Sequence, residues 1–464
     1  MRLSASDRKL SWYHKLVFAL GEFAPSVAVG TVIPFYFLFF LTDVAGVRPG
    51  IAGTILLIAR IWDAVNDPLV GALSDRTRSK LGRRRPYMLA GAVPMAVFYA
   101  LLWFVPPLAT SGARALYYLV IYLLFDLAYT FVSGPYYALT PEISLDTDER
   151  TSIVTYRAGV SIVTGLLAAV ALPFVFDAAG SMRMAFQWAG IAIGLFSMVP
   201  YFVLVALLRE RAEFQPADAA HVVRSARVLL RNRGFWLSLL LNGLAWLAIA
   251  MVEAVFAYFL IYWAMVSEAD TPIFLATILA SATVFLPVVN WLSKRYEKKW
   301  AFVIATSVWM VLHVALWWVP AASVVPVFIV AVLAGLGVSA AHVLPTAMGA
   351  DVLESVEIES GERQEGVFGG LSGFIQKLGT SLALAAVGWV LELTGYQPNA
   401  VAQSPAAMLG IRTLTTWVPA ALLVAAIAAA AAFPITRSVH HALNEELARR
   451  RAARRISLAP LDAE

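Results

Sequence analysis

Long apolar runs separated by polar segments dominate this chain. Twelve runs of about 18 or more mostly apolar residues can be counted, and a run of about 20 is enough for a helix to cross a bilayer. A polar break at residues 209–234 divides the runs into six and six. The pattern predicts an all-α polytopic membrane protein with twelve transmembrane helices in two six-helix bundles. The expected helices are centred near Ala28, Asp63, Val97, Ala128, Gly165, Phe196, Met251, Ala282, Met310, Ala331, Thr380 and Val424.

The polar break also gives the expected organisation of the chain. We expect an N-terminal six-helix bundle at residues 1–208, a central loop at 209–234, a C-terminal six-helix bundle at 235–436 and a basic tail at 437–464. Within the central loop, the segment from His221 to Arg233 has the pattern of a basic amphipathic helix lying at the membrane surface. The alternative interpretation is a segment that binds a partner.

Composition agrees with a membrane location. The 464 residues are 60% hydrophobic and 14% charged, whereas soluble domains average about 25% charged residues. The absence of cysteine excludes disulfides and thiol chemistry. The apolar stretch after the basic N-terminus is too long for a signal peptide, so we expect it to be retained as the first helix. The net charge of +5 is a topology signal rather than evidence for nucleic-acid binding.

Basic residues are concentrated in one set of loops. The segment from Asp75 to Arg85 contains six Lys or Arg residues, and the segment from Lys294 to Lys299 contains four. The positive-inside rule places these loops in the cytoplasm, together with the central loop and both termini. The pattern therefore predicts a multi-pass membrane protein with both ends of the chain on the cytoplasmic side.

The second apolar run carries charges that a bilayer excludes. Asp63 and Asp67 lie one helical turn apart, and Arg60 lies one turn before Asp63 on the same face. An ionised Asp near the bilayer centre costs about 2.5–3.5 kcal/mol on insertion scales. We therefore expect these side chains to face a protein interior or a wet cavity, where paired carboxylates suit a hard cation or a transferred proton. The alternative is an ion-pair network that only joins helices.

Three further polar residues interrupt apolar runs in the second half. Lys377 and Glu253 each need a functional or ionic partner within the membrane. His342 could carry a proton or make a structural hydrogen bond to a neighbouring helix. All three are therefore candidate site residues.

Several motifs follow one another in a characteristic order and spacing. They are TDVAG (Thr42 to Gly46), RIWDAVNDP (Arg60 to Pro68), DRTRSKLGRRRP (Asp75 to Pro86), AYTFVSGPYYALTPEISLDTDERT (Ala128 to Thr151), ADVLESVEIESGERQEG (Ala350 to Gly366) and IQKLG (Ile375 to Gly379). These motifs resemble those of the glycoside–pentoside–hexuronide:cation symporters of the major facilitator superfamily. The resemblance implies the major facilitator fold and secondary active transport across the cell's inner (plasma) membrane, with no cofactor and with Na⁺ or H⁺ as the coupling ion.

The resemblance implies a coupling-cation site between the second and fourth helices. Tyr129 would lie beside it, Arg60 would belong to its charge network, and Lys377 would reach across from the other half. A mobile cation could compete with Lys377 for the carboxylates, which would couple ion occupancy to the contact between the halves. The alternative is a static bridge. The cation-binding residues would be Asp63, Asp67, Asn66 and Thr130.

The chain differs from the family pattern at the positions that bind galactosides. Members that bind galactosides use an Asp on the first helix and another on the fourth, whereas these positions fall here on Ser26 or Val27 and on Ser133. Glu22 and Asp126 lie near them and could be relocated hydroxyl acceptors, proton carriers or interfacial residues. Galactoside specificity is therefore not carried over. The candidate cavity residues are Glu22, Ser26, Asp126, Ser133, Tyr136, Tyr137, Trp62, Trp246, Glu253, His342 and Gln376, although most aromatic residues must serve packing.

Charged loops of the family type also occur. They could tie helix ends together on the cytoplasmic side and form salt bridges between the bundles. Exposed pairs contribute only about 0–1 kcal/mol each, but a network could bias two states. The alternative is solvated charge that only fixes topology. The candidate gating residues are Asp75, Arg83, Arg84, Arg85, Glu142, Arg150, Asp351, Glu354 and Arg363.

Together these features predict cation-coupled symport of a small solute by alternating access, with a sugar or glycoside as the favoured solute. The alternative solute is a lysolipid or another amphipathic molecule, as in the animal lysolipid carriers that share the WDAxNDP-type helix. A membrane-embedded enzyme or a sensor is a remote alternative, because the sequence contains no HExxH, GxSxG or P-loop pattern. We expect a monomer that contacts the lipid bilayer and no nucleic acid.

Overall fold

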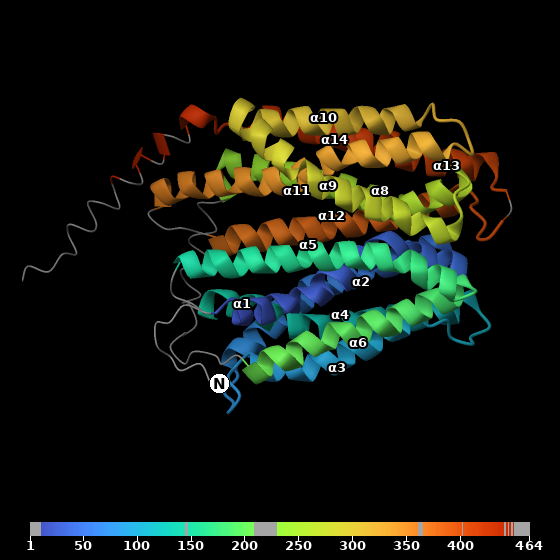
Figure 1. The fold of residues 1–464 in the computed structure, drawn as a ribbon, viewed down its shortest axis with the longest axis horizontal. Helices are drawn as coiled ribbons and strands as arrows, with labels where there is room; N and C mark the ends of the chain where they lie inside the picture. The colour runs from blue at the N-terminus through green and yellow to red at the C-terminus, as the bar shows by residue number, and fades with distance from the viewer. Residues whose placement is uncertain are drawn as a thin grey trace, which may run out of the picture.

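The computed structural model describes residues 11–143, 147–207, 230–360, 365–400 and 402–439, and five positions between 442 and 449. Within these residues the secondary structure is helical, and the described part contains no strand. Figure 1 shows the helices running nearly parallel to one another, with α8 to α14 in the upper half of the view and α1 to α6 in the lower half.

The first half contains helices of unequal regularity. Its elements are α1 (Trp12–Ala19), η1 (Leu20–Glu22), η2 (Ala24–Phe37), η3 (Phe40–Val44), α2 (Pro49–Arg76), α3 (Arg85–Leu102), α4 (Ser111–Ile143), α5 (Thr147–Ala178) and α6 (Met182–Leu207). The second half contains α8 (Arg233–Tyr262), η4 (Glu268–Asp270), α9 (Thr271–Tyr296), α10 (Lys298–Leu316), α11 (Val324–Ser360), α12 (Glu365–Leu393), α13 (Pro405–Thr415) and α14 (Trp417–Ala431).

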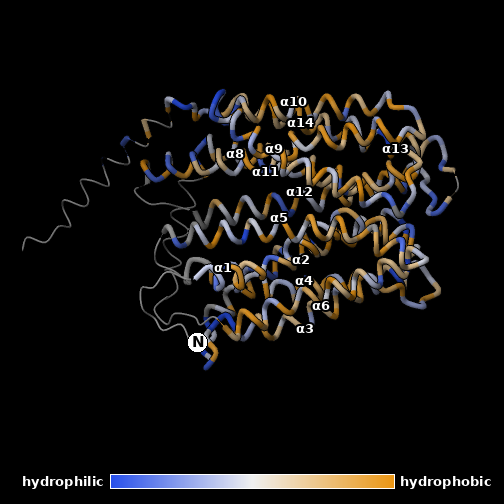
Figure 2. Tube along the Cα trace, viewed as in Figure 1, coloured by the Kyte–Doolittle hydropathy of each residue, from blue (hydrophilic) through white to orange (hydrophobic). Residues whose placement is uncertain are grey.

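Eleven helical segments in the described residues are long and apolar enough to cross a membrane. The helix α2 has 28 residues but is not among them, because its charged and amide side chains lower its hydropathy. Counting α2 as a spanning helix gives the twelve expected from the sequence. Figure 2 shows apolar residues along the helices and hydrophilic residues gathered toward their ends. Large apolar side chains such as Phe174, Phe196 and Trp318 are exposed on the helix surfaces, where a bilayer would cover them.

The first spanning segment departs from regular α-helix. Its central part, η2, has π-helical geometry and contains Pro34. Proline lacks a backbone donor, and widened turns of this kind are common at functional sites. The broken helix contributes Pro25, Val29 and Gly30 to the wall of the central cavity.

The two halves meet most extensively where α2 packs on α12, and η2 also packs on α8. Glycines allow backbone to approach backbone at the α2–α12 contact. A Cβ placed on Gly388 would lie 3.0 Å from the Cα of Gly53, and a Cβ on Gly53 would lie 2.9 Å from the Ala385 backbone. Since real Cβ atoms rarely come so close, this contact requires glycine on both helices.

Candidate functional site

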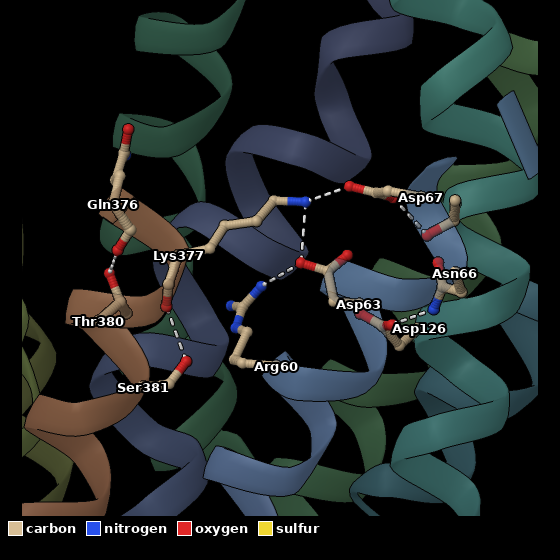
Figure 3. Close-up of polar contacts among 10 residues, drawn as sticks. Arg60, Asp63, Asn66, Asp67, Asp126, Gln376, Lys377, Thr380 and Ser381 are labelled. Carbon is tan, nitrogen blue, oxygen red and sulfur yellow. Dashed lines mark hydrogen bonds and ion pairs between the residues drawn. The ribbon is translucent and has the colours of Figure 1, made fainter. Parts of the chain in front are cut away.

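A lysine bridges two carboxylates across the contact between the halves. The Nζ of Lys377, on α12, lies 2.8 Å from Oδ2 of Asp63 and 2.5 Å from Oδ2 of Asp67, both on α2. The spacing of four residues brings both acids to one face of α2, as the sequence predicted. Figure 3 shows the Lys377 side chain extending from α12 toward the two carboxylates.

The two carboxylates differ in their exposure. The Asp63 side chain is 2% exposed and also lies 3.7 Å from an Arg60 nitrogen. The Asp67 side chain is 41% exposed, and its Oδ1 accepts a hydrogen bond of 3.0 Å from the Thr130 hydroxyl on α4. Asp63 is therefore the inner member of the pair, and Asp67 is the member that water or a cation reaches first.

A third carboxylate joins this cluster from α4. The Nδ2 atom of Asn66 donates a hydrogen bond of 2.7 Å to Oδ2 of Asp126. Asp126 is 5% exposed and lies within electrostatic range of Asp63, Arg60 and Lys377. We define the polar cluster as Arg60, Asp63, Asn66, Asp67, Asp126, Thr130 and Lys377. It contains three acidic and two basic side chains, and thus one more acidic group than basic groups among the described residues.

A cavity of about 320 Å³ adjoins the polar cluster between the two halves. Arg60 and Tyr129 reach it from the first half, and Lys377 reaches it from the second. The cluster therefore forms part of the cavity wall. The other polar and aromatic lining residues are Tyr137, Trp246, Glu253, Trp309, His342, Gln376 and Thr380.

The second-half wall carries an acid without a protein partner. Glu253, on α8, makes no hydrogen bond or ion pair with another residue that the structure describes. Near it, the Trp246 and His342 rings contact each other edge to face at 4.7 Å between centroids. The Nδ1 atom of His342 lies 2.8 Å from the Val338 carbonyl oxygen of the same helix. Glu253 and Trp246 thus offer an acceptor and an apolar ring to a bound solute.

Several cavity candidates from the sequence lie elsewhere in the structure. Glu22 accepts a hydrogen bond of 2.6 Å from Nε of Arg157 on α5, and it is 6% exposed. The Ser26 hydroxyl donates to the Ser161 carbonyl at 2.6 Å, and the Tyr136 hydroxyl donates to a backbone carbonyl. All three side chains thus have partners within the first half, and none of them is part of the cavity lining. Asp126, Ser133 and Trp62 are also outside its lining.

Arg157 was missed by the sequence reasoning. Its guanidinium also lies over the rings of Tyr136 and Tyr137, with distances of 5.1 Å and 4.8 Å to the ring centroids. The available signal was a lone Arg in an apolar run, of the same kind that drew attention to Lys377.

A second set of polar contacts joins the halves at the end of the molecule where α2 begins. Asp43 Oδ1 accepts hydrogen bonds from the hydroxyls of Tyr262, at 2.8 Å, and Tyr396, at 2.6 Å. The Asn399 amide donates to the Asp43 carbonyl at 2.6 Å, and the Thr42 and Tyr258 hydroxyls lie 2.8 Å apart. We call these six residues the Asp43 cluster. The sequence singled out only its TDVAG motif.

The expected gating residues that the structure describes lie at the opposite end, which carries the basic loops. Asp351 pairs with Lys298 of the same half at 2.5 Å. Arg85 donates to the Leu81 carbonyl at 3.1 Å, and Arg84 is largely buried. Arg83 and Glu354 also interact with other residues. The side chains of Asp75, Glu142, Arg150 and Arg363 lie outside the described residues, as does most of the predicted amphipathic helix.

Comparison with known proteins gives matches along nearly the whole chain. The model of the MFS/sugar transport protein family matches residues 17–437. An uncharacterized symporter of Synechocystis is 30% identical, with 96% of this chain and 98% of that protein covered. The isoprimeverose transporter of Lactiplantibacillus pentosus is 29% identical, with 88% and 85% covered. The sodium-dependent lysophosphatidylcholine symporter 1-A of Danio rerio is 29% identical, with 95% and 89% covered.

Solved structures share the fold at low sequence identity. The nucleoside transporter NupG superposes with a TM-score of 0.64 at 16% identity, with 91% of this chain and all of that chain covered. A bacterial homologue of the human lysosomal transporter Spinster, in an inward-facing conformation, gives a TM-score of 0.66 at 12% identity, with 90% and 94% covered.

Proposed function

The chain belongs to the MFS/sugar transport protein family, and we propose that it uses the polar cluster to couple Na⁺ or H⁺ movement to the uptake of a small solute. The protein is a multi-pass membrane transporter with the major facilitator fold rather than an enzyme. The observation that carries the proposal is the bridge from Lys377 to both Asp63 and Asp67, because it joins a titratable, ion-binding group to the contact between the halves.

Coupling follows from competition for the two carboxylates. Lys377 neutralises charge on Asp63 and Asp67 when no coupling ion is bound. A cation that binds at Asp67, the more exposed of the two carboxylates, weakens the attraction of Lys377 and so changes the energy of the α2–α12 contact. The two bundles then rock about the cavity and expose it alternately to the two sides.

The cavity favours a sugar or glycoside as the solute. Sugars present apolar faces to aromatic rings and hydroxyl donors to acceptors, which Trp246 and Glu253 supply on one wall. The similarity to the isoprimeverose transporter supports this choice.

A lysolipid is the second candidate solute, because the structure also contains an apolar groove separate from the central cavity. An apolar groove of about 740 Å³ lies beside the α2–α12 contact and is lined by Ile51, Ile55, Leu116, Leu119 and Trp389 among others. Such a groove could hold an acyl chain. The similarity to sodium-dependent lysophosphatidylcholine symporters supports this alternative.

The membrane and the assembly belong to the same proposal. We place both termini in the cytoplasm because the basic loops gather at one end of the molecule. We assign the protein to the inner (plasma) membrane, which the similarity to the inner membrane symporter YicJ of Escherichia coli supports. A monomer contains both halves of the cavity and therefore suffices for transport.

Uptake into proteoliposomes tests the proposal. Purified protein is given a labelled pentose-containing glycoside or labelled lysophosphatidylcholine under an imposed Na⁺ gradient, an imposed pH gradient, or neither. We expect glycoside accumulation that requires one of the gradients and is lost in Asp67→Asn. Accumulation of lysophosphatidylcholine but not of the glycoside would show that the solute is a lysolipid rather than a sugar. Solute entry that no gradient changes would overturn coupling.

A further inference from the structure

Asp126 is a buried acid whose only hydrogen-bond partner, in the part of the chain that the structure describes, is the amide of Asn66. It makes no ion pair of the kind that joins Lys377 to Asp63 and Asp67. It also lies outside the lining of the cavity. Asp126 is 5% exposed. Because an acidic side chain is costly to bury inside a membrane protein, we expect it to have a function.

The hydrogen bond to Asp126 fixes which way the Asn66 amide faces. The Nδ2 atom of Asn66 donates to Oδ2 of Asp126, so the NH₂ group points toward Asp126 and the carbonyl oxygen points away. Figure 3 shows the Asn66 nitrogen directed at Asp126 and its oxygen on the side where Asp67 lies. Asn66 is 2% exposed, and its Oδ1 atom has no donor among the described residues.

An unpartnered buried amide oxygen indicates a ligand of a particular chemistry. Burying an acceptor without a donor is unfavourable, so such atoms usually have an ion or water as partner. An amide oxygen is too weak a base to carry a proton, but it is a normal ligand of hard metal cations. The Thr130 hydroxyl donates its proton to Asp67, which leaves its oxygen lone pairs free for the same cation.

We propose that Asp126 is a positioning residue that turns the Asn66 carbonyl oxygen into the cation site, and that the coupling ion held there is Na⁺ rather than a proton. The inference rests on the proposed function, which leaves the ion open. Oxygen atoms of Asp63, Asn66, Asp67 and Thr130 would form the site.

Na⁺ binding to the purified full chain tests this assignment. Calorimetric titration and thermal unfolding are followed as NaCl replaces choline chloride at constant pH and ionic strength. We expect saturable binding by the wild type. Asp126→Asn should raise the Kd for Na⁺ by about 10–100-fold, the usual effect of removing a residue that orients a metal ligand.

A double-mutant comparison separates orientation from charge. If Asp126 acts through Asn66, then Asp126→Asn should cost little further affinity in an Asn66→Ala background. The matched control is Tyr118→Phe on the same helix, which loses a hydrogen bond to the Phe104 carbonyl far from the site and should bind Na⁺ with wild-type affinity. If Asp126→Asn does not fold, Asp126→Ser replaces it, because a hydroxyl both donates and accepts and so does not fix the amide.

Three results would overturn the inference. The first is an unchanged Kd for Na⁺ in Asp126→Asn, with only a lower unfolding temperature. The second is an equal loss of Na⁺ affinity on Asp126→Asn in the wild type and in the Asn66→Ala background. The third is no Na⁺ binding by the wild type at any pH. If the wild type binds no Na⁺ yet shows uptake driven by a pH gradient, the assignment of the ion fails while cation-coupled transport stands. Uptake that no gradient drives would instead refute the proposed function.

Discussion

Burial separates the roles of the two carboxylates that Lys377 contacts. Asp63 is enclosed and shared between Lys377 and Arg60, whereas the Asp67 side chain is 41% exposed. Removing one partner of a buried ion pair leaves an uncompensated charge and costs about 3–5 kcal/mol, but exposed pairs are worth far less. The two residues should therefore differ in what they contribute to stability, although both serve coupling.

Asparagine substitutions at the two positions should give the same transport defect and different stabilities. We expect Asp63→Asn and Asp67→Asn each to abolish concentrative uptake. Asp63→Asn should also lower the unfolding free energy by about 3–5 kcal/mol, since Arg60 loses its carboxylate, while Asp67→Asn should change it by about 1 kcal/mol or less. Thermal unfolding in detergent, beside uptake in proteoliposomes, measures both. Normal accumulation by either variant would remove that residue from the coupling mechanism.

Glu253 should act on solute affinity rather than on folding. It faces the cavity without a partner among the described residues, so Glu253→Gln breaks no protein contact there. The change replaces one of the two carboxyl oxygens by an NH₂ group, and the loss of a hydrogen bond to a solute hydroxyl is worth about 0.5–1.5 kcal/mol, which corresponds to a KM about 2- to 10-fold higher. Glu22→Gln is the matched control, because Glu22 pairs with Arg157 and should affect stability instead. An unchanged KM in Glu253→Gln would place the solute elsewhere.

At one end of the molecule, contacts between helices hold the two halves together. The end of the first helix, the end of α8 and the segment after α12 meet in the Asp43 cluster, close to the glycine contact between α2 and α12. Both features hold the halves together at the end away from the basic loops. Alternating access requires both to separate during the cycle.

The Asp43 cluster should make this closure sensitive to pH. Asp43 lies beyond the first span, Trp12–Phe37, and burial raises the pKa of its carboxyl although four hydrogen bonds act in the opposite direction. The closed form thus holds the proton more tightly than an open form in which Asp43 is hydrated. Acidification from above the raised pKa toward the usual value of about 3.9 should therefore favour closure, and higher pH should weaken it.

Access measurements can follow that equilibrium. The chain has no cysteine, so a single cysteine placed in the cavity reports entry of a thiol reagent from each side. Labelling from the side of the Asp43 cluster should rise with pH in the wild type and lose this pH dependence in Asp43→Asn. A dependence that persists unchanged in Asp43→Asn would assign it to another group.

The glycine contact should be intolerant of a single methyl group. A Cβ on Gly388 would lie 3.0 Å from the Gly53 Cα, so Gly388→Ala must push α2 and α12 apart at this end. We expect slower uptake and faster thiol labelling from the side of the Asp43 cluster. Gly370→Ala, on the same helix but with open space around its Cα, is the control and should behave as wild type. Equal uptake in the two variants would show that this contact does not limit the cycle.

At the scale of the whole molecule, the sequence predicted the bundle and one side of the site. Apolar periodicity located the spans, and residues of one helix such as Asp63 and Asp67 could be placed on a common face. Contacts between distant helices were accessible only where a known family supplied them, as for Lys377. Arg157 beside Glu22 and the partners of Asp43 depend on how helices pack, which a periodic pattern does not encode.

Na⁺ binding makes the charge of the polar cluster differ between two steps of the cycle. The loaded cluster carries one more positive charge than the unloaded cluster. An inside-negative membrane potential therefore favours inward crossing of the loaded form relative to the unloaded form. A unit charge moved through the whole field gains about 2.3 kcal/mol per 100 mV. Transport current should therefore rise with an inside-negative potential and level off once a step that moves no charge limits the cycle.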